Sequence, residues 1–97
     1  MITIDYFKHR AKILLKCWKN RDFSHWNIPA IIRFYCPSRF FSDAMDDAKL
    51  CRAQHFIVKM SNFNKWDELA HASESELERA KECLEHSRLS LLNEVKQ

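Results

Sequence analysis

The stretch that decides the fold is Leu50–Leu69, which reads LCRAQHFIVKMSNFNKWDEL. Its first half repeats apolar side chains at three- and four-residue steps, which predicts a helix with one buried face. Asn62 follows this helix, and asparagine tolerates the left-handed conformation that ends many helices. We expect Asn64 to cap the next helix, which carries Trp66 into the core. The stretch therefore predicts two helices joined by a tight corner.

A longer helix is predicted over residues 4–20, upstream of this corner. Thr3 is placed to cap it, and Asp5 complements the positive end of its dipole. The expected core-facing stripe consists of Ile4, Phe7, Ala11, Leu14, Leu15 and Trp18. At 100° per residue these positions cover an arc of roughly 100°, which is the width of a buried helix face. The lysines of this helix gather on an adjoining face: Lys8, Lys12, Lys16 and Lys19.

The region between residues 21 and 41 is less regular. Asn27 followed by Ile28-Pro29 is typical of a helix start, because proline is tolerated in the first turn. We expect this short helix to end at Tyr35, since Pro37 disfavours helical dihedrals in the residue before it. The composition of residues 31–35 also suits a short strand. We favour the helix because no partner strand is evident in the sequence.

Two further helices complete the pattern. One is expected to begin at Ser42 or Asp43 and to continue without a break to Met60. The last begins with a capping box, Ser73 to Glu76. Its apolar stripe is Leu77, Ala80, Leu84, Leu91 and Val95. The seven-residue spacing of three of these leucines suits either a seam inside the molecule, which we favour, or a homodimer.

The bulk composition indicates the fold class and the cellular compartment. The 97 residues, 46% apolar and without a glycine, suit one all-α domain: a compact bundle of four to five helices with short connections. No apolar run is long enough to span a membrane, and the N-terminus does not resemble a signal peptide. The four cysteines lack metal-site spacing, so reduced thiols and a cytoplasmic location are expected.

Charge is distributed unevenly along the chain. Residues 1–41 contain eight Lys/Arg against two Asp, a net +6, whereas residues 42–97 contain eight Lys/Arg against eleven acids, a net −3. We favour attraction between the two halves of one bundle as the explanation. The alternative is that the asymmetry steers a partner. For function, the alternative to protein binding is that the basic N-terminal helix binds nucleic acid.

The corner also resembles a known module. Short bacterial helical modules, found alone or preceding ankyrin-like and glyoxalase-related domains, carry a pattern close to A-Q-x-x-I-A-x-x-x-G-F-x-x-W-x-x-L. Here Ala53-Gln54 through Val58 and Asn62-Phe63 through Leu69 are similar to it, with valine and asparagine replacing an alanine and the glycine. The similarity covers about half the chain. It implies a compact helical fold, and it implies no residue-level activity.

No catalytic, cofactor or metal site is predicted. Cys51 and His55 share a helix face, but no nucleophile turn or orienting group accompanies them. We therefore expect a non-catalytic module that binds another protein, for instance a small regulator or inhibitor of a larger bacterial protein with an acidic surface. The candidate partner-binding residues are Trp26, Arg33, Phe34, Tyr35, Arg39, Phe40 and Phe41. Two interpretations of their aromatic side chains remain open: an exposed binding surface, or a roof over the core.

Overall fold

Six helices make up the part of the chain that the computed structural model describes, residues 2–37 and 40–94. They are α1 (Ile4–Lys19), α2 (Ile28–Tyr35), α3 (Phe41–Asp46), α4 (Leu50–Met60), α5 (Trp66–Ala70) and α6 (Glu74–Glu94). No strand occurs within these ranges, so the predicted all-α class is confirmed and the alternative of a strand at residues 31–35 is wrong. The count exceeds the predicted four to five by one, because the helix expected from Ser42 or Asp43 to Met60 is divided into α3 and α4.

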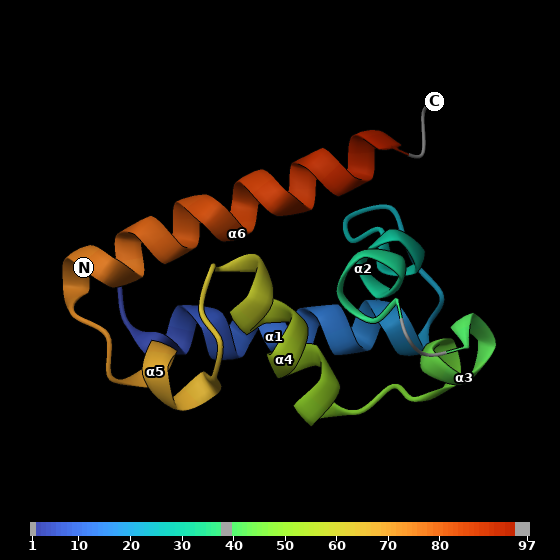
Figure 1. Cartoon of the computed structure of the whole chain (residues 1–97), viewed down its shortest axis with the longest axis horizontal. Coiled ribbons are helices and arrows are strands. Elements are labelled where there is room, and N and C mark those ends of the chain that lie inside the picture. The colour runs from blue at the N-terminus through green and yellow to red at the C-terminus, as the bar shows by residue number, and fades with distance from the viewer. Residues whose placement is uncertain (1, 38–39, 95–97) are drawn as a thin grey trace.

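The helices pack around one core. α4 crosses α1 (Figure 1). α6 runs along one side of the molecule, where it contacts both α2 and α4. The radius of gyration is 12.9 Å, which matches the value of about 13 Å for a single domain of about 100 residues. The largest fully buried side chains include Trp18, Trp26, Phe7, Leu14, Ile57, Met60 and Leu84.

The corner at Asn62 has the predicted left-handed backbone, with φ 67°. The Phe63 amide donates to the Val58 carbonyl at 3.0 Å, and the Asn62 amide donates to the Lys59 carbonyl at 3.1 Å. This pair of bonds is a Schellman motif, which satisfies carbonyls left without partners at the end of α4. The reversal after α4 therefore depends on a side-chain-bearing residue in a conformation that glycine usually adopts.

A second corner of the same kind ends α1, and the sequence analysis did not identify it. Arg21 has φ 55°, and the Asp22 amide donates to the Cys17 carbonyl at 2.9 Å. The motif that closes α4 thus also closes α1. No asparagine or glycine marks this position, so the sequence carries no signal for it.

The single helix predicted from Ser42 or Asp43 to Met60 is wrong. α3 begins at Phe41 without a side-chain cap, and the helical backbone is interrupted at residues 47–49. The Met45 carbonyl leaves the helical ladder and accepts a hydrogen bond from the Trp18 indole nitrogen at 2.8 Å. Asp47 adopts φ −96° and ψ 50° and pairs with Arg52 at 2.9 Å. A contact with α1 therefore replaces the local bonds that would have continued the helix.

Most of the predicted helix starts are confirmed. The Thr3 hydroxyl accepts from the Asp5 amide at 3.3 Å. Ser73 and Glu76 form the capping box through bonds of 3.1 and 3.3 Å. The prediction that Asn64 caps α5 is wrong, because α5 starts one residue later, after Lys65, and has no side-chain cap.

Asn27 does more than begin α2. Its side-chain oxygen accepts from the Ala30 amide at 3.3 Å, as an N-cap does. Its side-chain nitrogen donates to the Leu91 carbonyl at 2.8 Å, and the residue is 6% exposed. One buried amide therefore both starts α2 and fastens it to α6.

The heptad-spaced leucines of α6 lie inside the molecule. Leu77, Leu84 and Leu91 are all buried against the other helices, which is the intramolecular seam that we favoured. Val95, the last expected member of the stripe, lies outside the described residues. Among the helices of the described ranges, none is both long and apolar enough to cross a membrane.

Candidate interaction surface

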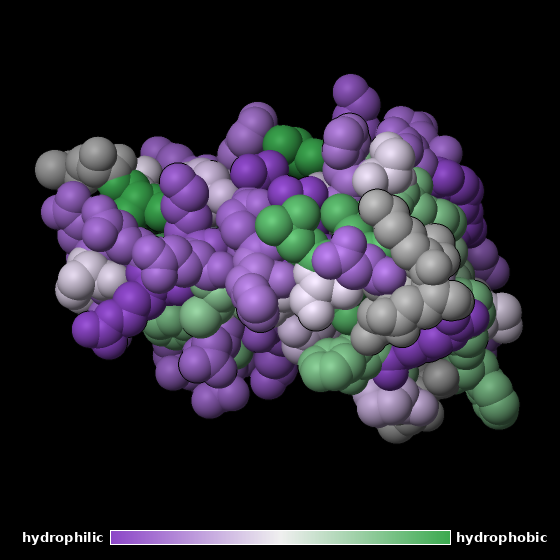
Figure 2. All heavy atoms as spheres, turned by 90° about the horizontal axis from the view of Figure 1, so that it is seen from above, coloured by the Kyte–Doolittle hydropathy of each residue, from purple (hydrophilic) through white to green (hydrophobic). Residues whose placement is uncertain are grey.

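Five of the predicted partner-binding residues lie on α2 and at the start of α3. We define the aromatic surface as Arg33, Phe34, Tyr35, Phe40 and Phe41. Phe40 is 81% exposed and Phe34 is 66% exposed. Figure 2, which views the molecule from the side of α6, shows hydrophobic atoms exposed among hydrophilic ones at the end where Figure 1 places α2. Large apolar side chains are thus exposed on two helices that contact each other, α2 and α3.

The periodicity of α2 explains why Phe34 faces water. The buried residues of this helix are Ile28, Ile31 and Ile32. At 100° per residue, Phe34 lies roughly 115° from the centre of that stripe. Because only one face of α2 meets the core, a fourth large apolar residue is left outside it.

Contacts within the aromatic surface fix its shape. The Arg33 guanidinium lies over the Phe41 ring at 4.5 Å, which joins α2 to α3. The Phe34 and Tyr35 rings meet edge-on at 4.8 Å. A cation above a ring face and a perpendicular ring pair are both favourable geometries. Contacts within the protein therefore hold part of this surface in place.

Tyr35 forms the boundary between this surface and the core. Its ring is half-buried, and burial raises the pKa of its hydroxyl, although a hydrogen bond with Ser87 lowers the pKa in part. The hydroxyl therefore stays protonated at neutral pH and acts as a hydrogen-bonding group rather than a charge.

A hollow of about 400 Å³ adjoins the aromatic surface, between α2, the end of α4 and α6. Its lining includes Phe34 and Tyr35 together with Lys59 and His86, and it contains no carboxylate. The hollow combines an apolar wall with a basic side chain. It can receive an apolar side chain that has an acidic neighbour.

The remaining predicted residues have different positions. Trp26 is 1% exposed and belongs to the core, where the Arg88 guanidinium lies 5.7 Å from its ring. Arg88 also donates to the His25 carbonyl at 3.0 Å. Trp26 is therefore part of the roof over the core and is not available to a partner. Arg39 lies outside the described residues.

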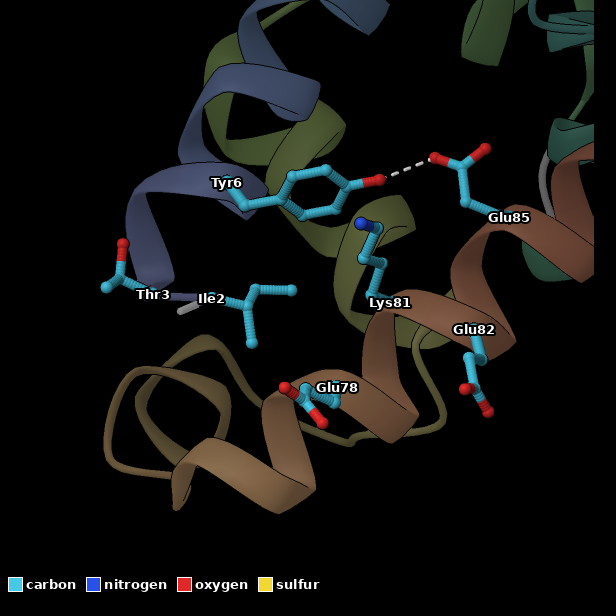
Figure 3. A pocket seen from close by; sticks show the side chains of 7 residues that line it. All are labelled: Ile2, Thr3, Tyr6, Glu78, Lys81, Glu82 and Glu85. Atoms are coloured by element: carbon cyan, nitrogen blue, oxygen red, sulfur yellow. Dashed lines mark hydrogen bonds between the residues drawn. The ribbon is translucent and has the colours of Figure 1, made fainter.

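A larger hollow, of about 600 Å³, lies between the N-terminal end of α1 and α6 (Figure 3). The Tyr6 hydroxyl donates to the Glu85 carboxylate at 2.7 Å, and the Lys81 ammonium lies 5.2 Å from the Tyr6 ring. The sequence carries no signal for this hollow, because Tyr6 and Glu85 are 79 positions apart.

Glu85 is fully engaged in this second hollow. Arg10 pairs with one carboxylate oxygen at 3.0 Å, and Arg88 donates to the other at 2.9 Å. Burial raises the pKa of Glu85, but the hydrogen bonds from Tyr6 and Arg88 and the charge of Arg10 outweigh burial and lower it. A carboxylate that is held ionised with both oxygens occupied is poorly suited to accept a proton from a substrate. Its role is to connect α1 to α6.

The two residues considered for catalysis lie on the outer face of α4. Cys51 and His55 are both exposed, and no hydrogen bond joins them in the described part of the chain. His55 instead lies against the Phe56 ring, with 6.1 Å between centroids. Within residues 2–37 and 40–94 no group of three or more His, Cys, Asp or Glu is arranged to hold a metal ion.

Comparison of the chain with protein-family models, with curated proteins and with solved structures found no match. The similarity to the bacterial helical module stays a prediction from the corner residues.

Proposed function

We propose that this protein is a non-catalytic interaction module that binds another protein through the aromatic surface. The observation that carries the proposal is the exposure of Phe34 and Phe40, at 66% and 81%, next to an arginine that is already stacked on Phe41. Exposed aromatic and arginine side chains are the types that contribute most to binding energy at protein interfaces. Water contact with such rings is unfavourable, and a partner would remove it.

The chemistry of the surface suggests the partner. Arg33 and Lys59 border the exposed rings, and the hollow beside them has no acidic lining residue. An acidic protein surface with an apolar anchor complements this arrangement. Regulation or inhibition of a larger protein is the class of role that a small module without catalytic groups would perform. The four unpaired cysteines fit work in a reducing compartment such as the cytoplasm.

The test uses the tagged 97-residue chain as bait in an extract of the cells that produce it. The Phe34→Ala/Phe40→Ala double variant removes both exposed rings at little cost to folding, because surface substitutions usually change stability by about 0.5 kcal/mol or less. Leu89→Ala is the matched control, since Leu89 is 52% exposed and lies on α6. We expect one protein, identified by mass spectrometry, to be retained by the wild type and by the control and lost with the double variant.

Affinity for that purified protein should then fall roughly 30-fold or more in the double variant, as for interface hot spots. Circular dichroism of all three proteins checks that they are equally folded. Retention that is equal for the wild type and the double variant would contradict the proposal.

A further inference from the structure

A second surface, apart from the aromatic one, lies where α1 meets the first residue of α4. It is a hollow of about 340 Å³ lined by Lys12, Leu15, Lys16, Lys19, Asn20 and Leu50, which we call the α1–α4 groove. Its lining contains three cations and no anion. The volume is within the range of binding pockets, which begins at about 300 Å³.

The three lysines of the α1–α4 groove are free. Lys12, Lys16 and Lys19 are exposed and form no ion pair within the described residues. Other lysines nearby are paired, since Lys8 lies 3.9 Å from Asp5 and Lys49 lies 3.4 Å from Asp47. The groove therefore keeps a concentrated positive charge that the protein itself does not neutralise.

The floor of the groove is apolar. Leu50 is 40% exposed, and Leu15 is half-buried against the core. Leu50 is the first residue of α4 and follows directly on the interruption at residues 47–49. Two leucines bordered by lysines resemble half of a helix–helix interface, with apolar contacts inside and charges along the edge.

We propose that the α1–α4 groove binds an acidic amphipathic helix of a partner protein. Lys12, Lys16 and Lys19 follow one face of α1 over about 10 Å, at 1.5 Å per residue. Carboxylates at three- and four-residue steps on a facing helix have the same spacing. A leucine or similar residue of that helix would fill the hollow above Leu15 and Leu50. This is helix-in-groove recognition with complementary charge.

The same lysines were considered above as a nucleic-acid site, and the lining favours the helix. Specific and single-strand nucleic-acid sites commonly rely on arginine forks and on stacked aromatic rings. The groove lining contains neither an arginine nor an aromatic residue. Phosphates would be attracted by the lysines but would gain nothing from the two leucines.

The probe is a fluorescein-labelled peptide of about five helical turns, with a leucine stripe flanked by glutamates. A second peptide has serine in place of each leucine, and thus keeps the charge but not the apolar stripe. Fluorescence anisotropy measures the binding of each to the full chain. We expect the leucine peptide to bind and the serine peptide to bind roughly tenfold more weakly or worse.

Variants of the protein locate the site. The triple change Lys12→Gln, Lys16→Gln and Lys19→Gln should weaken binding roughly tenfold to a hundredfold, since each exposed ion pair contributes modestly. Leu50→Ala should weaken it roughly threefold to tenfold. Lys8→Gln is the control on the same helix outside the groove and should leave affinity unchanged. The Phe34→Ala/Phe40→Ala variant should also leave it unchanged, which separates this proposal from the previous one.

Three results would overturn the proposal. The first is peptide binding that is absent or insensitive to Leu50→Ala. The second is tighter binding to duplex DNA of mixed sequence, with the steep salt dependence of phosphate contacts between about 50 and 200 mM. The third is concentration-dependent association in sedimentation velocity that the triple lysine change abolishes, which would make a second copy of the chain the occupant.

Discussion

Replacing Asn62 tests the backbone conformation on which the second half of the fold depends. Its φ of 67° lies in the left-handed region, and two backbone hydrogen bonds of 3.1 and 3.0 Å close the corner there. Its side chain is exposed and forms no hydrogen bond within the described residues. A substitution therefore changes the backbone preference and little else.

The left-handed conformation costs an ordinary L-residue about 1–2 kcal/mol, and asparagine less. Asn62→Ala should consequently reduce the free energy of unfolding by about 1 kcal/mol. Asn62→Gly removes the Cβ clash, while the added freedom of the unfolded chain offsets part of the gain. We expect the glycine variant to be at least as stable as the wild type.

Urea unfolding followed by circular dichroism measures these differences as shifts in midpoint at constant slope. In a thermal melt, the midpoint of the alanine variant should lie about 4–8 °C below that of the wild type. Asn64→Ala is the control, because Asn64 is an exposed asparagine two positions away that caps no helix. The reasoning is refuted if the alanine variant is as stable as the wild type, or if glycine is worse than alanine at position 62.

Two further predictions concern α6. Leu84→Ala should reduce the free energy of unfolding by about 2–5 kcal/mol, because the Leu84 side chain is 0% exposed. Leu89→Ala should reduce it by about 0.5 kcal/mol or less, because Leu89 is 52% exposed. Differential scanning calorimetry compares the two variants. The pKa of Glu85 is lowered in the folded protein, so the ionised carboxylate stabilises the fold at pH values above the usual pKa of 4.5. This contribution is lost as the pH falls through the folded-state pKa. Glu85→Gln should therefore be less stable than the wild type at neutral pH, and the difference in stability should shrink in acid. Thermal melts at a series of pH values measure this difference. A difference that is the same at all pH values would contradict the ion-pair role.

Sequence predicted the parts of the fold that depend on neighbouring residues. The N-cap at Thr3, the proline-marked start of α2 and the capping box at Ser73 all arise from side chains within three positions of the backbone that they satisfy. The corner at Asn62 is equally local, because the residue type itself tolerates the conformation. Such features can be recognised without knowing the rest of the structure.

Features that depend on distant residues were not predictable. The interruption at residues 47–49 depends on the Trp18 indole, which lies 27 positions before the carbonyl that it binds. The connection between Tyr6 and Glu85 spans most of the chain. For the candidate site, composition indicated an excess of aromatic residues, but only packing showed that Trp26 is buried and Phe34 is not.

The bond from Trp18 to the Met45 carbonyl also affects the outside of the molecule. It ends α3 and separates it from α4, so α3 is held where Phe41 meets Arg33. An interior tryptophan thus helps to position α3 and, with it, one part of the aromatic surface. Under the proposed function, a change at position 18 would weaken binding although Trp18 is buried. Mutagenesis alone would then count this residue among the contacts.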